Sequence, residues 1–261
     1  MGETIAIINQ KGGCGKTTTA VNLSASIATL GKSVLIVDMD PQGNTTTSFG
    51  INKQELENTV YSAISGQVSV KKAIIPTMVD NLFILPSNIS LSGVEVELSK
   101  LDNYHLVLKE LLAPIKDIFE YIIIDLPPSL GIITVNGLVA SDSLIIPIQA
   151  EYFALEGLAD LTNTINLVEE RLKSPSPIKG IVLTLYDSRT RLGKEVYVEL
   201  KKYFGDKEHM FKTVISRNIR LAEAPSYGMP CIAYDEESRG ARSYLKLAKE
   251  ILELDEEKNQ S

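Results

Sequence analysis

Continuous runs of isoleucine, valine and leucine recur along the chain and alternate with longer amphipathic segments. Apolar residues at successive positions, rather than at every second position, are typical of parallel strands that are buried on both faces of a sheet. The runs therefore predict buried parallel strands. Six are expected, at 3–9 (ETIAIIN), 33–38 (SVLIVD), 121–128 (YIIIDLPP), 142–148 (DSLIIPI), 178–185 (IKGIVLTL) and 211–216 (FKTVIS).

The segments between these runs place apolar residues at the period of an α-helix. The first predicted helix extends from Lys16 to Leu30 and is followed by Gly31, a residue type that commonly ends helices. Further helices are expected near 55–66, 91–101, 104–115, 130–141, 153–172, 192–204, 219–226 and 238–254. Alternating strands and helices imply βαβ units. The expected fold is therefore α/β, with a doubly wound, mostly parallel sheet in a single domain over residues 1–261.

The composition is that of a globular protein that needs no cross-links. The chain has 261 residues, of which 44% are hydrophobic and 23% are charged, and this excludes a disordered or collagen-like chain. Neither of its two cysteines, Cys14 and Cys231, has another cysteine or a histidine at metal-ligand spacing, so structural zinc is not expected. We expect a reduced, cytoplasmic protein. No apolar run approaches the roughly 18 residues of a membrane span, and the acidic terminus is repelled by anionic lipid, so no membrane is expected as a partner.

Charge is distributed unevenly along the chain, whose net charge is −7. Residues 1–170 carry 9 basic and 19 acidic side chains, whereas residues 171–249 carry 16 basic and 9 acidic ones. The last twelve residues carry 1 basic and 5 acidic side chains, and an acidic tail is expected at about 253–261. A basic segment inside an acidic chain predicts a localised anion-binding face.

A glycine-rich loop, Gln10-Lys-Gly-Gly-Cys-Gly-Lys-Thr-Thr18, joins the first predicted strand to the first predicted helix. Glycines allow a tight turn in which successive backbone N–H groups face an anion, and the N-terminus of the following helix adds positive charge. This context predicts a site for the phosphates of a nucleotide. Gln10 stands where the usual pattern G-x-x-x-x-G-K-S/T has its first glycine, and Lys11 precedes two glycines. The result is the deviant Walker A pattern of a P-loop NTPase, K-G-G-x-G-K-S/T.

The polar groups of this loop have expected partners on the nucleotide. Lys16 can reach the β- and γ-phosphates, the Thr17 hydroxyl can bind Mg²⁺, and Thr18 can bond a phosphate nearer the sugar. The residues expected to contact the nucleotide through this loop are Lys11, Gly12, Gly13, Cys14, Gly15, Lys16, Thr17 and Thr18. The alternative is a glycine-rich turn that binds nothing, and the position of the loop between strand and helix disfavours it.

Aspartates follow two of the predicted strands. Asp38 and Asp40 come at the end of the second strand, and Asp125 follows the apolar run 122–124. Ligands of open α/β sheets bind beyond the carboxyl ends of the strands, so these side chains are expected to face the phosphate loop. We expect Asp125 to hold Mg²⁺ through water, Asp40 to orient the attacking water, and Asp38 to make structural or metal-shell bonds. Helix capping or a turn is the ordinary alternative for one aspartate alone, and it explains the set poorly.

Three stretches carry a resemblance to a known family, the ParA/Soj-type partition ATPases, within the wider group that includes MinD. They are NQKGGCGKTTTAVNLSASIATLGKSVLIVDMDPQGNTTTSFG, YIIIDLPPSLGIITVNGLVASDSLIIPIQAEYFALEGL and SRNIRLAEAPSYGMPCIAYDEESRGARSYLKLAKEI. Together they span nearly the whole chain. The third stretch is the most diagnostic, because general P-loop proteins lack it.

The resemblance implies an ATPase that forms a sandwich homodimer with two ATP molecules at its interface. Lys11 matches the signature lysine that reaches the partner's phosphates, so Lys11, Lys16 and Asp40 are the residues expected to act in hydrolysis. Gly12 matches a site where the partner's backbone approaches closely, and a side chain there should block dimerisation. The segment expected to contact the base is Ser216, Arg217 and Asn218. Asn218 would offer the adenine edge one donor and one acceptor.

Two positions depart from the family pattern. Cys14 stands where a small aliphatic residue is usual. Beside phosphates and a helix N-terminus its thiol could have a lowered pKa and oxidise readily, but we favour the alternative that it acts as a small hydrophobic residue. Ser216 replaces a proline often found before Arg-Asn, which leaves the contacts of the base segment open.

The resemblance also implies that the ATP-bound dimer binds double-stranded DNA without reading its sequence. The candidate contacts are Arg189, Arg191, Arg217, Arg220, Arg242 and Lys246. Such cations would bind phosphates by releasing counterions. For each cation alone the alternative is a solvated face or a surface salt bridge, which we favour for Lys201, Lys202 and Lys249. Hydrolysis, slow by itself and stimulated by a ParB/Spo0J-type centromere-binding protein, would release the DNA. The protein would then be nucleoid-associated only when it is bound to ATP.

Four other functions are possible on this scaffold. A MinD-like ATPase at a membrane needs a basic amphipathic C-terminal helix, whereas the acidic terminus here is repelled by anionic lipid. An iron–sulfur reductase needs cluster cysteines, which are lacking around the DLPPS segment at 125–129. A tyrosine kinase on this scaffold needs a terminal tyrosine cluster, which is also lacking. A nucleotide-gated scaffold without hydrolysis stays open, and loss of turnover in Asp40→Ala would exclude it.

Overall fold

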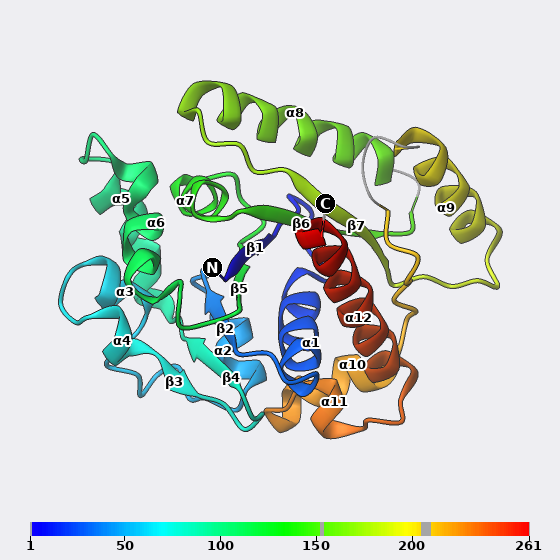
Figure 1. Ribbon diagram of the computed structural model, residues 1–261, viewed down its shortest axis with the longest axis horizontal. Helices are drawn as coiled ribbons and strands as arrows, with labels where there is room; N and C mark the ends of the chain where they lie inside the picture. Colours follow the sequence, from blue (N-terminus) through cyan, green and yellow to red (C-terminus); the bar gives the residue numbers. More distant parts are fainter. Residues whose placement is uncertain (1, 152–153, 205–209, 261) are drawn as a thin grey trace.

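A seven-stranded sheet crosses the molecule, and helices cover both of its faces (Figure 1). The computed structural model describes residues 2–151, 154–204 and 210–260. The strand order is β3-β4-β2-β5-β1-β6-β7, and every neighbouring pair is parallel except β3 with β4. The strands are β1 Glu3–Ile7, β2 Val34–Asp38, β3 Ile75–Pro76, β4 Leu82–Leu85, β5 Tyr121–Asp125, β6 Ser143–Gln149 and β7 Ile178–Thr184. The prediction of a doubly wound, mostly parallel sheet in one α/β domain is confirmed.

Long helices follow most of the central strands, and short helical turns fill the connections. The α-helices are α1 Lys16–Thr29, α2 Asn44–Ser48, α3 Val60–Ile64, α4 Val70–Ala73, α5 Val94–Leu98, α6 Val107–Leu112, α7 Ile132–Ala140, α8 Ala154–Leu172, α9 Arg191–Phe204, α10 Ile219–Glu223, α11 Cys231–Tyr234 and α12 Arg239–Gln260. The 3₁₀ turns are η1 Ile89–Gly93, η2 Tyr104–Leu106, η3 Ala113–Ile115 and η4 Ala224–Tyr227. Within the described ranges, none of the helices combines the length and apolar character needed to cross a membrane.

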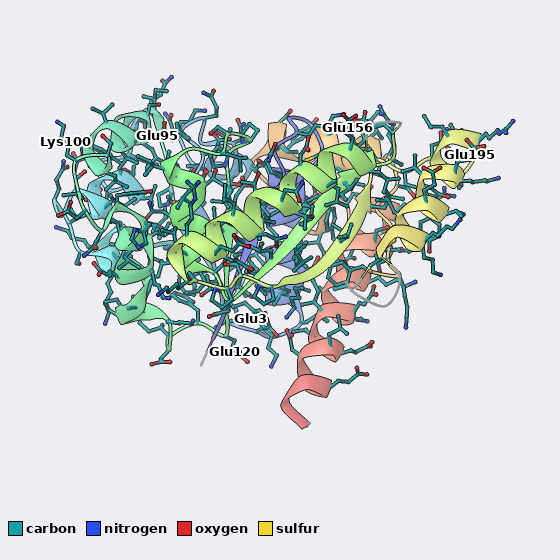
Figure 2. All side chains as sticks on the ribbon, turned by 90° about the horizontal axis from the view of Figure 1, so that it is seen from above. Glu3, Glu95, Lys100, Glu120, Glu156 and Glu195 are labelled. Carbon is teal, nitrogen blue, oxygen red and sulfur yellow. The ribbon has the colours of Figure 1, made fainter. Side chains whose placement is uncertain are left out.

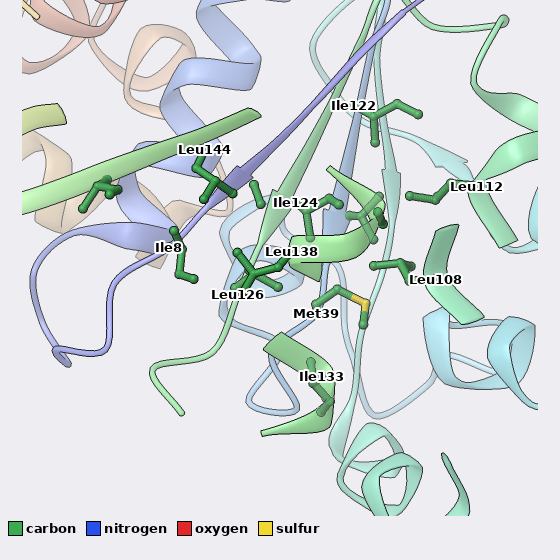
Figure 3. Close-up of a cluster of buried hydrophobic side chains, with 14 of the residues drawn as sticks. Ile8, Met39, Leu108, Leu112, Ile122, Ile124, Leu126, Ile133, Leu138 and Leu144 are labelled. Atoms are coloured by element: carbon green, nitrogen blue, oxygen red, sulfur yellow. The ribbon is translucent and has the colours of Figure 1, made fainter. Parts of the chain in front are cut away.

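Successive strand residues belong to two hydrophobic layers, one on each face of the sheet. In β5, Ile122 and Ile124 lie in one layer and Ile123 lies in the other. Figure 3 shows the first layer, where side chains of β5 meet Leu108 from α6 and Leu138 from α7. The second layer lies beneath α1 and α12, which pack against each other. Because both faces are covered, the strands read in the sequence as continuous apolar runs.

The strand predicted at 211–216 is wrong. The segment runs beside β7 but makes only isolated bridges there. The backbone N–H groups of Lys212 and Thr213 turn away and donate to the Glu250 carboxylate of α12, at 2.6 and 3.0 Å. A strand cannot form a continuous ladder when neighbouring N–H groups bond a side chain on another element.

Several other boundaries differ from the prediction. The strand β4 was not predicted, because its run of four apolar residues is short and ends at Pro86. The helix expected at 55–66 begins only at Val60, where a capping box of Thr59 and Ser62 starts it. The helices expected at 91–101 and 104–115 are broken into α-helical and 3₁₀ pieces. The helix expected at 153–172 begins at Ala154 in the described residues.

The acidic terminus is the last part of α12 rather than a separate tail. Asp255 of this helix forms an ion pair with the buried ammonium of Lys179 and accepts a hydrogen bond from Tyr121 Oη at 2.9 Å. Lys179 also pairs with Glu3 at 2.6 Å. This network fastens α12 to the amino ends of β1, β5 and β7. Figure 2 shows Glu3 at this end of the molecule, beside Glu120.

The opposite edge of the sheet gathers the carboxyl ends of its central strands. In the parallel pairing of β2 with β5, Asp38 lies opposite Asp125, and in that of β1 with β5, Ile7 lies opposite Asp125. The glycine-rich loop leaves this same edge after β1. The sheet therefore brings the loop and both aspartates together, as the sequence predicts.

Candidate nucleotide-binding site

The glycine-rich loop turns into α1 through two left-handed glycines. Gly13 has a φ of 74° and Gly15 a φ of 91°, a conformation that favours glycine. A Cβ placed on Gly12 or Gly13 would meet no described atom within 4 Å, so this part of the loop borders open space. No side chain caps the N-terminus of α1. Its first N–H groups are thus available to an anion.

Lys16 holds its ammonium over the loop. The residue is only 7% exposed, and Nζ donates a hydrogen bond to the backbone oxygen of Lys11 at 2.9 Å. A cavity of about 670 Å³ opens in front of this ammonium. It is lined by the loop and by Asp40, Pro41, Gln42, Asn44, Ser92, Pro127, Pro128, Ser129 and Leu185. Its size fits the phosphates and sugar of a nucleotide.

Asp125, buried behind the cavity residue Thr17, has one carboxylate oxygen that is not hydrogen-bonded. Its Oδ2 accepts hydrogen bonds from Thr17 Oγ1 at 2.9 Å and Thr45 Oγ1 at 2.7 Å. Its Oδ1 is buried and has no hydrogen-bond partner in the described structure. Burial raises the pKa of this carboxyl to about 6, and the neighbouring Asp40 charge acts in the same direction.

These groups fit Mg²⁺. A buried carboxylate oxygen without a partner, such as Asp125 Oδ1, needs a cation or a proton, and the other oxygen of this carboxylate bonds the Thr17 hydroxyl. The described residues contain no cluster of three or more metal-binding side chains. Magnesium keeps several waters and is usually held by one or two protein groups together with phosphate oxygens. Asp125 and Thr17 would hold it.

Asp38 is occupied within the protein. Its Oδ2 accepts from the backbone N and from Oγ1 of Thr46, at 2.8 and 2.7 Å, and its Oδ1 accepts from the backbone N of Asp40 at 3.2 Å. Burial and the charge of Asp125 raise its pKa to about 7. Of the two roles expected of Asp38, these are the structural bonds, because both of its oxygens fasten the loop and helix that follow β2. A place in the metal shell stays a prediction.

Asp40 lines the cavity from the loop between β2 and α2. It is 9% exposed, and its Oδ1 accepts from the backbone N of Gln42 at 2.8 Å. The backbone oxygen of Asp40 accepts from the N of Gly43 at 2.9 Å, where α2 begins. This placement beside the phosphate loop is the one expected of a residue that orients water.

A smaller pocket, of about 110 Å³, continues from the loop to the segment that the sequence assigns to the base. Ser216 and Asn218 line it together with Gly15, Thr18 and Tyr244. Arg217 is exposed and does not line this pocket. The Asn218 Oδ1 caps α10 by accepting from the N–H groups of residues 220 and 221 at 2.9 and 3.4 Å. With Oδ1 engaged in this cap, the amide N–H₂ is the group that Asn218 has left to offer a base, and the donor-and-acceptor pairing with adenine stays a prediction.

Two residues of the loop behave differently from each other. Cys14 is fully buried, its backbone oxygen accepts from Thr184 Oγ1 at 2.7 Å, and burial raises the pKa of its thiol. The alternative of an activated Cys14 thiol is therefore wrong, and Cys14 acts as a small buried residue.

The Lys11 side chain is 48% exposed and forms an ion pair with Glu151, which follows β6. A half-exposed lysine next to Gly12, which lines the cavity, can exchange this partner for a phosphate.

Of the basic residues expected to bind DNA, Arg191 belongs to α9, Arg220 to α10, and Arg242 and Lys246 to α12, and these three helices lie in the right half of Figure 1. Four of the six are engaged in ion pairs within the chain: Arg189 with Asp187, Arg191 with Glu195, Arg220 with Glu223 and Asp235, and Arg242 with Glu237. Arg217 and Lys246 are exposed. The six residues come from α9, α10, α12 and the loops that precede α9 and α10.

Sequence reasoning missed three residues that contact the site: Thr45, Thr46 and Glu151. The threonines are the start of the run Asn44-Thr-Thr-Thr47, directly after the loop that carries Asp40. Hydroxyl residues that start a helix next to predicted metal ligands could have indicated that they bond those carboxylates. Glu151 lies far from Lys11 in the sequence, and no local pattern joins them.

Comparison with known proteins agrees with this site. The sequence model of a family described as AAA domain matches residues 2–177. The sporulation initiation inhibitor protein Soj of Bacillus subtilis is 53% identical over 96% of this chain and 98% of its own length. The chromosome-partitioning ATPase Soj of Treponema pallidum is 48% identical over 98% of this chain and 99% of its own.

A solved structure shares the fold over nearly the whole chain. It is cobyrinic acid a,c-diamide synthase from Mycobacterium smegmatis with a bound ATP analogue and magnesium, at 32% identity and a TM-score of 0.83. The alignment covers 95% of this chain and 93% of that one. A protein of this fold and this similarity thus holds an ATP analogue together with magnesium.

Proposed function

Because the chain belongs to the Soj/ParA family of partition ATPases, which use ATP and Mg²⁺, we propose that ATP switches it between a dimer that binds DNA and a monomer that does not. The dimer would bind double-stranded DNA without sequence preference. Hydrolysis would release it, and so move or position a DNA segment.

The observation that carries the proposal is the cavity in front of the uncapped N-terminus of α1, which adjoins a second pocket and is lined by Thr17, the residue that bonds the Asp125 carboxylate and its unpartnered Oδ1. Lys16 and the first N–H groups of α1 would hold the phosphates. Bound Mg²⁺ would neutralise charge on the β- and γ-phosphate oxygens. Asp40 would orient the attacking water, because its carboxylate lines the same cavity.

The open mouth of the cavity supports a dimer. Gly12 faces free space, and Lys11 beside it is half exposed, so both can meet a second copy of the chain. A cation supplied by the second copy makes hydrolysis depend on assembly, as an arginine finger does. Turnover by the protein alone would be slow, and a ParB/Spo0J-type partner would stimulate it.

Surface cations support DNA binding by the dimer. Ion pairs between exposed side chains contribute about 0–1 kcal/mol each, so a DNA phosphate can replace the acidic partner of Arg189 or Arg220 at little cost. The net charge of −7 makes binding by one monomer weak, and a dimer doubles the number of contacts. The protein would be cytoplasmic and would associate with the nucleoid in its ATP form.

A MinD-like role at a membrane or protein surface is the alternative function. The last turns of α12 carry the exposed acidic residues Glu253, Glu256 and Glu257, and anionic lipid repels such a helix end. This part of the structure does not favour docking on a membrane.

Turnover and assembly of purified protein test the ATPase cycle. ATP·Mg²⁺ should produce a dimer in sedimentation velocity, and ADP·Mg²⁺ should not. Asp40→Ala should dimerise with ATP but release no phosphate. If Asp40→Ala hydrolyses ATP at the wild-type rate, the proposed role of Asp40 is excluded. If the wild type dimerises without any turnover, the chain is a nucleotide-gated scaffold.

A further inference from the structure

Two consecutive threonines at the start of α2 contact the two aspartates that end neighbouring strands. Thr45 donates to Asp125 Oδ2 at 2.7 Å, and Thr46 donates to Asp38 Oδ2 at 2.7 Å. Both threonines are fully buried. Asp38 and Asp125 lie opposite each other in the pairing of β2 with β5. Successive side chains of a helix point about 100° apart, and this divergence lets one helix turn reach both strands.

Asp125 is held from two sides, and this decides which of its oxygens is free. Thr17 bonds Oδ2 from the phosphate loop, and Thr45 bonds the same oxygen from α2. Oδ1 has no partner within the described ranges. With one donor alone the carboxylate could rotate about that bond, whereas two donors on Oδ2 limit the rotation and so fix the position of both oxygens.

The same helix is tied to the loop that carries Asp40. Gly43, which precedes α2, donates its N–H to the backbone oxygen of Asp40 at 2.9 Å. The N–H of Asp40 in turn bonds Asp38 Oδ1 at 3.2 Å. A continuous chain of bonds therefore leads from Asp125 through Thr45 and Gly43 to Asp40. Whatever fixes Asp125 also limits the freedom of the Asp40 loop.

We propose that Thr45 is a positioning residue for the magnesium site: it fixes the Asp125 carboxylate for the metal and links metal binding to the loop that carries Asp40. The inference rests on the ATP- and Mg²⁺-dependent site argued above, and it is independent of DNA binding and of any partner protein. Outer-shell groups of this kind change metal affinity by about 10- to 100-fold when they are lost.

Valine, serine and a neighbouring threonine separate the role of the hydroxyl from that of packing. Thr45→Val keeps the shape of the side chain and removes the hydroxyl, and Thr45→Ser keeps the hydroxyl. Thr47→Val is the matched control on the same helix. The Thr47 hydroxyl bonds the backbone oxygen of Gly43 at 3.0 Å, and Thr47 is exposed.

The readout is the Mg²⁺ concentration at which half of a fluorescent ATP analogue, methylanthraniloyl-ATP, is bound at fixed protein concentration. Thr45→Val should raise this midpoint about tenfold, and binding of the analogue in EDTA should not change. Thr45→Ser and Thr47→Val should stay within about twofold of the wild type, the size of change expected where no ligand-orienting bond is lost. An unchanged midpoint in Thr45→Val, or equal shifts in Thr45→Val and Thr47→Val, would overturn the proposal.

A purely structural role would give a different result. It would lower the melting temperature in EDTA and leave the Mg²⁺ midpoint where it is. If Thr45→Val does not fold, Thr45→Ala is measured in the same way, because it leaves space rather than a methyl group against the carboxylate. If the wild type itself binds the analogue without any dependence on Mg²⁺, the magnesium site fails and not the role of Thr45 alone.

Discussion

Gly228 and Gly50 meet backbone to backbone, and replacing Gly228 with alanine tests this contact. Their φ values are 67° and 74°. A Cβ on Gly228 would lie 2.5 Å from the Cα and 2.9 Å from the N of Gly50, and a backbone cannot move aside as a flexible side chain can. Gly228 follows η4 and Gly50 follows α2 by two residues. The contact therefore joins the segment after α10 and η4 to the segment after α2, the helix whose Thr45 bonds Asp125.

The cost of the substitution can be separated into backbone strain and collision. Gly66 is the matched control: its φ is 71°, and a Cβ there would meet no described atom within 4 Å. Alanine in a left-handed conformation costs about 1–2 kcal/mol, offset by about 0.4–1 kcal/mol because the unfolded chain becomes less free. Gly66→Ala should thus lower the free energy of unfolding by about 1 kcal/mol. Overpacking adds about 1–3 kcal/mol for Gly228→Ala, which gives about 2–4 kcal/mol in total.

Urea unfolding followed by circular dichroism measures both variants in the nucleotide-free protein. The expected result is a loss for Gly228→Ala that exceeds the loss for Gly66→Ala by at least about 1 kcal/mol. Equal losses would mean that strain alone explains both substitutions, and the close approach of the two backbones would be refuted.

Three further changes test other parts of the site. Gly12→Val should fold and bind ATP as a monomer but fail to dimerise in sedimentation velocity, since its side chain meets free space within the chain; an ATP-driven dimer of this variant would contradict the proposed interface. Glu151→Gln removes an exposed ion pair that costs about 0.5 kcal/mol to break, and so frees Lys11 in each of two subunits. The affinity of ATP-driven dimerisation should therefore increase about fivefold, and by less at high salt. Weaker dimerisation would show that Glu151 also contacts the second copy. The pKa of Asp38 is raised to about 7 in the folded protein, against about 3.8 in the unfolded chain, so between these values the folded protein holds a proton that the unfolded chain has lost. This proton stabilises the folded protein at low pH, and the stabilisation is lost as pH rises through 7. Between pH 7.5 and 5.5 the metal-free wild type should therefore gain stability relative to Asp38→Asn in urea unfolding, and a constant difference would contradict the shift.

The parts of the fold that the sequence predicts are those that depend on local pattern. The central strands β1, β2, β5 and β6 are buried on both faces and therefore appear as continuous apolar runs. The phosphate loop is predictable for a similar reason, because its glycines, lysine and threonines are adjacent in the chain. Parallel strands then place Asp38, Asp40 and Asp125 near it, since their carboxyl ends share one edge.

The rest depends on contacts between distant residues. The segment 211–216 has the composition of a strand, but the Glu250 carboxylate takes two of its N–H groups. The structural bonds of Asp38 become visible only when Thr46 is seen to contact it. Cys14 looks reactive beside a helix N-terminus until its burial is known. In each case a contact made in the folded chain shows a role that the local pattern leaves open.

Binding to a random-sequence DNA duplex tests whether ATP controls DNA binding by this protein. It would be measured by fluorescence anisotropy with ATP·Mg²⁺, ADP·Mg²⁺ or no nucleotide, at two salt concentrations, for the wild type, for Asp40→Ala and for the double variant Arg189→Ala with Arg220→Ala. The wild type should bind DNA only with ATP·Mg²⁺, and its affinity should fall steeply with salt. Asp40→Ala should still bind, and the arginine double variant should not. A dimer that forms with ATP but binds no DNA in any state would contradict the proposed function.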